Sequence, residues 1–244
     1  GPCAYNPEPL ADFADVILIG EGEELNIEFY QVWADHLKRH DGKMNKKELL
    51  DEVVKIPGVY IPRFYDVAYD DAGHVLAVTP NHPDAPATIY KRVLKTMDNA
   101  FFPENPIVPY MDVIHDRAML EVQRGCTRGC RFCQAGMLYR PVREKTVEEL
   151  RTQTQNILHN TGHNEVSLTS LSTSDYTCVD VLLRTLIADV QGRNIGVSLP
   201  SLRVDNFSMN LANEMQKVRK SGLTFAPEAG TQRLRDVINK GVLE

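Results

Sequence analysis

Three cysteines within eight residues carry the chemistry that this sequence encodes most clearly. Cys126, Cys130 and Cys133 form the pattern C-x3-C-x2-C in a segment that also contains Gly125 and Gly129. Three thiolates at this spacing on a loop can wrap one cubane iron–sulfur cluster. Because no fourth cysteine lies nearby, one iron would have no protein thiolate and would be open to a substrate or a cofactor.

The segment around these cysteines is basic, although the chain as a whole is acidic. From Gln123 to Lys145 the segment has a net charge of +5, whereas the remainder of the chain has −11 and the whole chain −6. The local charge would stabilise thiolates, a negatively charged cluster and a carboxylate-bearing ligand; a solvated charged face is the alternative interpretation. The acidic total argues against nonspecific binding of nucleic acid or anionic membrane by the whole surface. The basic residues are Arg124, Arg128, Arg131, Arg140, Arg143 and Lys145.

A structural zinc site is the alternative interpretation of the cysteines. Its fourth ligand would be His115, Cys178 or Cys3. Zinc sites more often pair two Cys-x2–4-Cys or Cys/His knuckles, and the sequence has no second knuckle. We expect Cys178, at the start of a predicted helix, to be a small buried apolar residue and Cys3 to be a loop residue.

Length and composition are those of an ordinary globular protein. The chain has 244 residues, of which 43% are hydrophobic and 25% charged, enough for one or two domains with a sizeable core. No apolar run approaches the roughly 18 residues of a membrane span, and no signal peptide is evident. Clustered cysteines favour metal or redox chemistry in a reducing compartment, so we expect a cytoplasmic protein with no membrane partner.

The first 42 residues have the pattern of a strand followed by a helix. Asp15 to Ile19 is rich in Val and Ile, which predicts a strand buried on both faces of a parallel sheet. From Glu23 the apolar residues recur at helical spacing. We interpret this part as the last strand and helix of a domain that begins upstream.

A helix and a β-hairpin are predicted next. Asn45, with Glu48 three residues later, forms a capping box for a helix that stops before Pro57. Residues 59–69 and 74–78, joined by a turn sequence, predict a hairpin, and residues 88–94 a third strand. Three prolines then make an extended connector.

Strands alternating with helices follow, which predicts a parallel sheet with right-handed crossovers. Four strands cannot close a barrel, and the last predicted helix runs to the end of the chain, so we expect a partial barrel and a fragment of a longer protein. The strands start near Met119, Val166, Ile195 and Leu223. The helices are residues 146–158 with a capping box at Thr146 and Glu149, Val179 to Val190, Met209 to Lys220, and Thr231 to about Lys240.

The cysteine motif resembles that of the radical S-adenosylmethionine (SAM) superfamily. There, three cysteines at this spacing hold a [4Fe-4S] cluster whose fourth iron chelates SAM. A longer resemblance, over residues 117–143, 167–176, 199–205 and 225–231, is to an uncharacterised bacterial family in which a cobalamin-binding-like domain precedes the radical domain. Residues 1–9 and 20–24 are similar to the end of that first domain, so the resemblance covers nearly the whole chain.

This resemblance implies an α/β fold with a partial parallel (β/α) TIM-like barrel of the radical SAM type. Residues 1–42 would be the C-terminal end of a cobalamin-binding-like, Rossmann-like domain. Residues 43–115 would be a β-rich connector, and residues 116–244 the N-terminal part of the barrel. The histidine segment that ligates cobalamin would lie before Gly1, so cobalamin binding is undecidable from this fragment.

Further cofactor contacts should come from the carboxyl ends of the later strands, where α/β sheets bind ligands. Ser172, with Ser170 and Ser174, could hold the methionyl amino group, Arg203 the carboxylate and Glu228 the ribose hydroxyls. The family resemblance places Phe132 beside the adenine. The superfamily's Gly-Gly-Glu signature after the second strand is absent, and turn, capping or loop-packing roles are the alternative interpretations.

The resemblance implies reductive cleavage of SAM to methionine and a 5′-deoxyadenosyl radical, which abstracts a substrate hydrogen. The catalytic residues and the substrate are unknown from the sequence, and relatives that modify RNA make an RNA base one candidate. A flavodoxin or ferredoxin would donate the electron. Two other functions remain open: an iron–sulfur electron carrier without a SAM site, and an RNA-binding module that uses the basic loop and a structural zinc.

Overall fold

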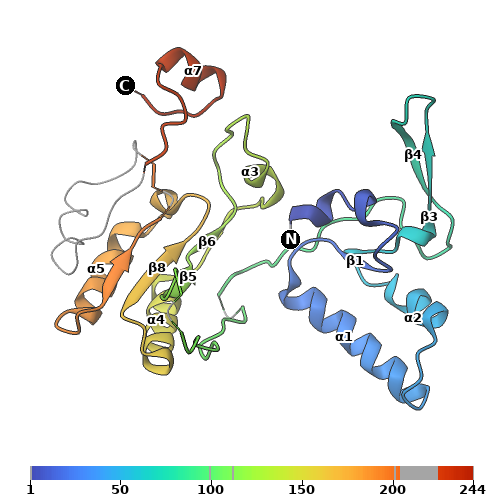
Figure 1. Ribbon diagram of the computed structural model, residues 1–244, viewed down its shortest axis with the longest axis horizontal. Helices are drawn as coiled ribbons and strands as arrows, with labels where there is room; N and C mark the ends of the chain where they lie inside the picture. Colours follow the sequence, from blue (N-terminus) through green and yellow to red (C-terminus); the bar gives the residue numbers. More distant parts are fainter. Residues whose placement is uncertain (1, 99, 112, 201, 204–224, 244) are drawn as a thin grey trace. The chain divides into compact units, whose positions relative to one another are not determined.

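Two compact units make up the computed structural model, residues 1–95 and 96–244, and each is described by itself (Figure 1). The structure describes residues 2–98, 100–111, 113–200, 202–203 and 225–243. Within these residues, no helix combines the length and the apolar character needed to cross a membrane.

Two packed helices dominate the first unit. α1 (Gly22–Arg39) and α2 (Lys46–Val53) contact one another, and their apolar faces bury Leu25, Phe29 and Val53. The capping box at the start of α2 is confirmed, because the Asn45 side chain accepts a hydrogen bond from the Glu48 amide. Helix spacing and capping are local properties, which is why the sequence located both helices.

The strands of the first unit pair differently from the prediction. β1 (Ile17–Leu18) pairs antiparallel with β2 (Val59–Tyr60), so the predicted parallel strand at residues 15–19 is wrong. Helix residues bury this short apolar run: Ile17 and Ile19 share a core with Leu25 and Val53. An apolar run of this length therefore did not define the direction of its partner.

The predicted hairpin is confirmed from residue 65 onward, and the predicted third strand is not. β3 (Tyr65–Tyr69) pairs antiparallel with β4 (Val75–Pro80) across the expected turn. The first part of the predicted strand is wrong, because residues 59–64 form β2 and a 3-10 helix instead. Residues 88–94 form no strand and make only an isolated bridge between Arg92 and Gly20. At Gly20 a Cβ atom would lie 2.3 Å from the Arg92 carbonyl oxygen, so only glycine permits this crossing.

A three-stranded parallel sheet forms the centre of the second unit. Its order is β5 (Ala118–Glu121), β8 (Glu165–Thr169) and β9 (Gly196–Ser198). The crossovers are α4 (Val147–Thr161) and α5 (Val179–Val190), which confirms the alternating pattern predicted from the sequence. A complete barrel is not formed by the described residues.

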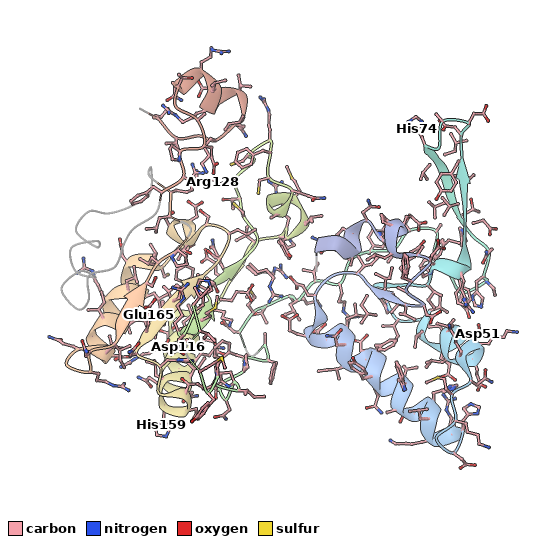
Figure 2. The ribbon with its side chains drawn as sticks, viewed as in Figure 1. Asp51, His74, Asp116, Arg128, His159 and Glu165 are labelled. Carbon is pink, nitrogen blue, oxygen red and sulfur yellow. The ribbon has the colours of Figure 1, made fainter. Side chains whose placement is uncertain are left out.

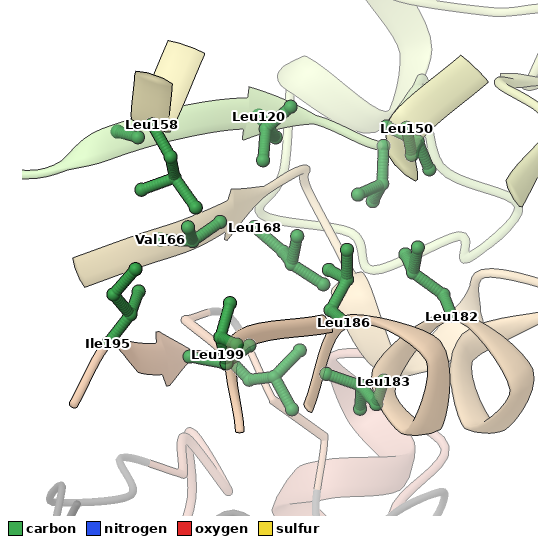
Figure 3. Packing of buried hydrophobic residues seen from close by; sticks show 14 of the residues in the cluster. Leu120, Leu150, Leu158, Val166, Leu168, Leu182, Leu183, Leu186, Ile195 and Leu199 are labelled. Atoms are coloured by element: carbon green, nitrogen blue, oxygen red, sulfur yellow. The ribbon is translucent and has the colours of Figure 1, made fainter. Parts of the chain in front are cut away.

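One face of this sheet is apolar and covered by the two helices (Figure 3). Leu120 and Leu168 point into a core that also contains Leu150 and Leu186 from the helices. Side chains alternate along a strand, so Glu121 and Thr169, which are paired in the register, belong to the opposite face. These two side chains therefore lie on the sheet face opposite the crossover helices α4 and α5.

Shorter elements follow β5 and end the chain. β6 (Gln123–Arg124), α3 (Ala135–Leu138) and β7 (Arg143–Glu144) were not predicted. α7 (Gln232–Val237) is shorter than predicted because the chain turns at Asn239, where φ is 55°. Four 3-10 helices complete the described part: Pro2–Tyr5, Glu8–Leu10, Pro62–Phe64 and Thr173–Asp175.

Two predicted elements fall on residues that the structure does not describe. The predicted helix from Met209 to Lys220 lies entirely outside the described residues, as does most of the strand predicted from Leu223. Phe225 is described, and it forms a parallel bridge with Leu202. This bridge has the direction expected for a continuation of the parallel sheet.

Candidate functional site

A short antiparallel pair closes the base of the loop that carries the three cysteines. Gln123 of β6 lies opposite Glu144 of β7, so residues 125–142 form one closed loop beyond β5. Gly125 begins this loop with φ +94°, and a Cβ atom there would lie 2.6 Å from the Tyr139 carbonyl oxygen. Both the backbone conformation and the close approach require glycine.

An ion pair ties the cysteine loop to the carboxyl end of β8. The guanidinium of Arg128 donates to both carboxylate oxygens of Asp175, with a distance of 2.8 Å from Nε to Oδ2. Ser172 donates to the same carboxylate at 2.8 Å. The Arg128 amide donates to the Cys126 sulfur at 3.4 Å, so the residue held by Asp175 also contacts a motif thiol.

Figure 2 shows Arg128 at the end of the sheet opposite Asp116 and Glu165, which precede or begin strands. The cysteine loop therefore occupies the carboxyl end of the parallel strands. Ligands of parallel α/β sheets bind at this end.

Seven of the site residues predicted from the sequence line one cavity of about 260 Å³, whereas Ser170 and Ser174 do not line it. It lies between the cysteine loop, the segment after β8 and the segment around α7. The predicted residues are Cys126, Cys130, Phe132, Cys133, Ser172, Arg203 and Glu228, and the wall also contains Arg128, Leu171, Leu202, Ala226 and Lys240. A larger cavity of about 590 Å³ in the first unit contains none of them.

Buried charged groups shape the far wall of this cavity. Arg203, only 6% exposed, donates to the Lys240 carbonyl oxygen at 2.9 Å. The Lys240 ammonium group donates to Glu228 at 3.0 Å and lies 6.0 Å from the centre of the Phe132 ring. Glu228 itself adopts a positive φ of 68°, unusual outside glycine. These residues place two cations, one carboxylate and an aromatic ring around the cavity.

The three motif thiols are free and half-buried. In a tetrahedral zinc site with Zn–S bonds near 2.3 Å, two sulfur atoms lie about 3.8 Å apart. The described residues contain no group of three cysteines whose sulfur atoms all lie within 4.8 Å of one another, so the thiols are not arranged as the ligands of one zinc ion.

Cys178 is exposed, so the prediction of a buried apolar residue is wrong. It precedes α5 directly, with no side-chain capping bond, and so lies at the edge of the helix rather than on its buried face. The buried face of α5 begins with Leu182 and Leu183.

Much of the predicted basic charge is engaged within the protein. Arg124 pairs with Glu121 and Arg128 with Asp175. Arg131 and Arg140 donate to backbone carbonyl oxygens. Burial lowers the pKa of Lys145, whose ammonium group donates to the Gln153 side chain at 2.9 Å. The cationic groups thus mainly organise the loop, which weakens its interpretation as a nucleic-acid surface.

A second cavity, of about 340 Å³, adjoins the first. Its lining includes Glu121 and Thr169 from the sheet face opposite the helices, and Leu171 lines both cavities. Gln123, 2% exposed, donates to the Ser172 carbonyl oxygen at 2.7 Å, whereas its own Oε1 atom has no hydrogen-bond partner among the described residues. A buried amide oxygen of this kind is suited to accept a hydrogen bond from a ligand.

Residues 120–244 match the family described as the radical SAM superfamily, and residues 1–62 match the family described as radical SAM proteins, N-terminal. The first match spans half of the chain. The protein belongs to the radical SAM superfamily. The cofactors of this superfamily are a [4Fe-4S] cluster and SAM.

A curated relative and a solved structure extend the comparison. An uncharacterised protein from Methanocaldococcus jannaschii is 36% identical over 126 residues, which are 52% of this chain and 27% of that protein. The radical SAM methyltransferase TsrM from Kitasatospora setae, solved with tryptophan and a SAM analogue, matches 94% of this chain and 41% of its own at a TM-score of 0.52 and 12% identity. This likeness concerns the fold. The radical SAM chain described here spans less than half of either protein.

Sequence reasoning missed two residues that shape the radical SAM site. Asp175 follows the predicted Ser172, and Lys240 lies beyond α7, more than 100 residues from the cysteines. Asp175 lies in the segment of family resemblance at residues 167–176 but was given no role, and Lys240 belongs to no recognisable motif. A search for acidic partners of the motif arginine would have found Asp175, whereas Lys240 joins the site only through the fold.

Proposed function

We propose that Cys126, Cys130 and Cys133 bind three irons of the [4Fe-4S] cluster and that the adjoining cavity binds SAM. When bound, the cluster supplies the electron that cleaves SAM reductively to methionine and a 5′-deoxyadenosyl radical. The observation that carries this proposal is the gathering of the three thiols and four more predicted residues around one cavity.

The chain's own residues would bind and orient SAM. Arg203 and Lys240 offer positive charge to the methionyl carboxylate, and Glu228 offers acceptors to the ribose hydroxyls. Phe132 offers a ring face for the adenine. The Ser172 hydroxyl already donates to Asp175, so we propose that it contributes mainly by holding the Arg128–Asp175 pair. This changes its role from the amino-group contact predicted from the sequence.

We further propose that the substrate binds in the second cavity, against the sheet face opposite the crossover helices, which would be the interior of the barrel. The unpartnered Gln123 oxygen favours a substrate with an N–H or O–H donor, and Leu171 and Tyr139 offer apolar contacts. An unstacked RNA base has such donors and a flat face, so it is the substrate class to test first. Addition of RNA should increase 5′-deoxyadenosine formation; a Gln123→Leu variant should lose this increase but keep the RNA-independent rate.

The remaining parts of the proposal follow from the sequence. We propose residues 1–42 as the end of a cobalamin-binding-like domain, residues 43–115 as a connector and residues 116–244 as part of the radical SAM barrel. A flavodoxin or ferredoxin in a reducing cytoplasm would supply the electron.

Anaerobic reconstitution tests the central proposal. We expect about four irons and four sulfides per chain, and an electron paramagnetic resonance signal that changes when SAM is added. Colourless protein that retains zinc after reconstitution would refute the cluster. A cluster whose signal is indifferent to SAM would instead support the electron-carrier alternative.

Single cysteine variants identify the ligands. Cys126→Ala, Cys130→Ala and Cys133→Ala should each lose most of the iron, whereas Cys178→Ala and Cys3→Ala should retain it. Cys178 is the matched control because it is a free thiol in the same unit. Equal loss from a control would mean that the ligand set is different.

A further inference from the structure

The loop that carries the three cysteines presents a cationic and apolar surface to solvent. Residues 125–142 contain three arginines and no acidic residue. Arg131, Gln134, Met137 and Arg140 are exposed, and Met137 is 54% accessible. These four residues are termed the loop surface. None of them lines the cavity proposed to bind SAM or the adjoining cavity, so neither ligand accounts for this surface.

The positive charge of Arg131 is held in place without being neutralised. Arg124 and Arg128 pair with carboxylates. The Arg131 guanidinium instead donates to the Val237 carbonyl oxygen, and no carboxylate in the described part of the chain pairs with it. A carbonyl oxygen fixes the guanidinium but has no net charge. Arg131 therefore keeps a full positive charge at the surface.

The loop surface lies close to the thiols that we propose as cluster ligands. Arg131 directly follows Cys130 in the chain. α3, the short helix of the cysteine loop (Figure 1), packs against Cys133, since a Cβ atom at Gly136 would lie 3.9 Å from the Cys133 sulfur. Met137 is the next residue of this helix. A protein that contacts Met137 is thus separated from a proposed cluster ligand by α3 alone.

We propose that the loop surface docks an acidic protein that donates one electron to the cluster. This inference rests on the proposed function, because it requires a cluster at the three cysteines. One electron passes from the reduced carrier to the cluster, so the carrier is oxidised by one electron and no atom is transferred. The carrier must bring its redox group close to the cluster, and the loop surface allows this approach.

Charge complementarity selects an acidic carrier. Outside residues 123–145 the chain has a net charge of −11, which repels an acidic protein and favours its contact with the basic loop. Met137 adds a flexible apolar contact, which suits a small and transient electron-transfer interface. RNA is a less suitable occupant, because its backbone needs several cations and carboxylates already neutralise Arg124 and Arg128.

Flavodoxin, an acidic one-electron carrier, is the probe, and the full chain with its cluster reconstituted is the target. Met137→Glu should weaken the binding of oxidised flavodoxin about fivefold and slow cluster reduction by flavodoxin hydroquinone to a similar extent. Arg131→Gln should act in the same direction. Both differences should shrink at about 1 M salt, where the Debye length is only about 3 Å. Calorimetry measures the binding, and stopped-flow absorption measures the reduction.

Val181→Glu is the matched control. Val181 is 57% exposed on α5 in the same unit, so this variant also replaces an exposed apolar helix residue with a carboxylate. It changes the net charge of the chain as much as Met137→Glu does, but α5 is a crossover helix outside the cysteine loop. We expect its flavodoxin binding and reduction rate to equal those of the parent.

Two results would overturn the proposal. One is equal flavodoxin binding by the parent and Met137→Glu; the other is an equal loss of binding in Val181→Glu. Photoreduced deazariboflavin, a small uncharged reductant, distinguishes these results from a failure of the proposed function, because a parent chain that it cannot reduce lacks the cluster. Flavodoxin binding tests the loop surface in either case. An RNA oligonucleotide that displaces flavodoxin from the parent would assign the surface to nucleic acid and also overturn the proposal.

Discussion

Two regions of this radical SAM protein are assembled in opposite ways. The junction between α1 and α2 is built from 13 consecutive residues, 36 to 48, through a helix end and a capping box. The cavity beside the cysteines draws on residues from Cys126 to Lys240, which meet only because parallel strands bring their carboxyl ends together. The first arrangement depends on local helix geometry, whereas the second depends on the whole sheet.

The largest expected effect comes from the base of the cysteine loop. Gly125→Ala should remove more than half of the bound iron, because the new methyl group would contact the Tyr139 carbonyl oxygen at 2.6 Å. Gly162→Ala is the matched control: Gly162 also has a positive φ but has open space around it. We expect the control to lose about 1 kcal/mol of stability and to keep its iron. Iron analysis and thermal unfolding distinguish the two outcomes.

A somewhat smaller effect is expected at the pair that ties the loop to β8. Asp175→Asn should lower the free energy of unfolding by about 2 kcal/mol, since Asp175 is largely buried while Arg128 is one-third exposed. It should also change the electron paramagnetic resonance spectrum of the cluster. Asp189→Asn breaks a similar two-bond pair with Arg151, on the helices α4 and α5. If both variants alter the spectrum equally, the loop pair has no special role.

Lys240 tests whether the distant segment belongs to the SAM site. Lys240→Met should weaken SAM binding about tenfold, or ~1.4 kcal/mol, because it removes a cation and leaves Glu228 without its partner. The iron content should stay unchanged. Calorimetric titration of the reconstituted protein with SAM measures the effect, and Arg233→Met, on exposed α7, provides the control. Unchanged affinity in Lys240→Met would exclude Lys240 from the site.

The smallest effect concerns the helices behind the sheet. The hydrogen bond from Arg151 lowers the pKa of Asp189 below its ordinary value. The ionised Asp189 carboxylate therefore stabilises the folded state above about pH 4, and this contribution is lost as the pH falls through the folded-state pKa of Asp189. In Asp189→Asn we expect Tm to fall by about 3 °C or less at pH 7, and the difference from the parent to shrink in acid. A constant difference down to pH 2 would contradict this explanation.

Local signals predicted much of this fold. Thr146 and Glu149 located the start of α4, and the apolar spacing gave α5 its observed limits, Val179–Val190. Strand partners were less predictable: β1 is antiparallel because its partner follows two helices, and short apolar runs do not encode that return. The site shows the same contrast between local and long-range information. The spacing of the cysteines identified them in the sequence, whereas Lys240 and Asp175 could be identified only from the three-dimensional structure.

The contacts between the cysteine loop and the end of α7 have a consequence for biosynthesis. The Arg131 amide donates to the Ile238 carbonyl oxygen at 2.9 Å, and Asn239 donates to the Gly129 carbonyl oxygen at 2.8 Å. These partners are translated more than 100 residues after the loop. At typical synthesis rates of about 5–20 residues per second, the thiols stay uncovered on the nascent chain for several seconds. Iron and sulfide would therefore reach the thiols most easily during this early interval, before residues 238 and 239 contact the loop.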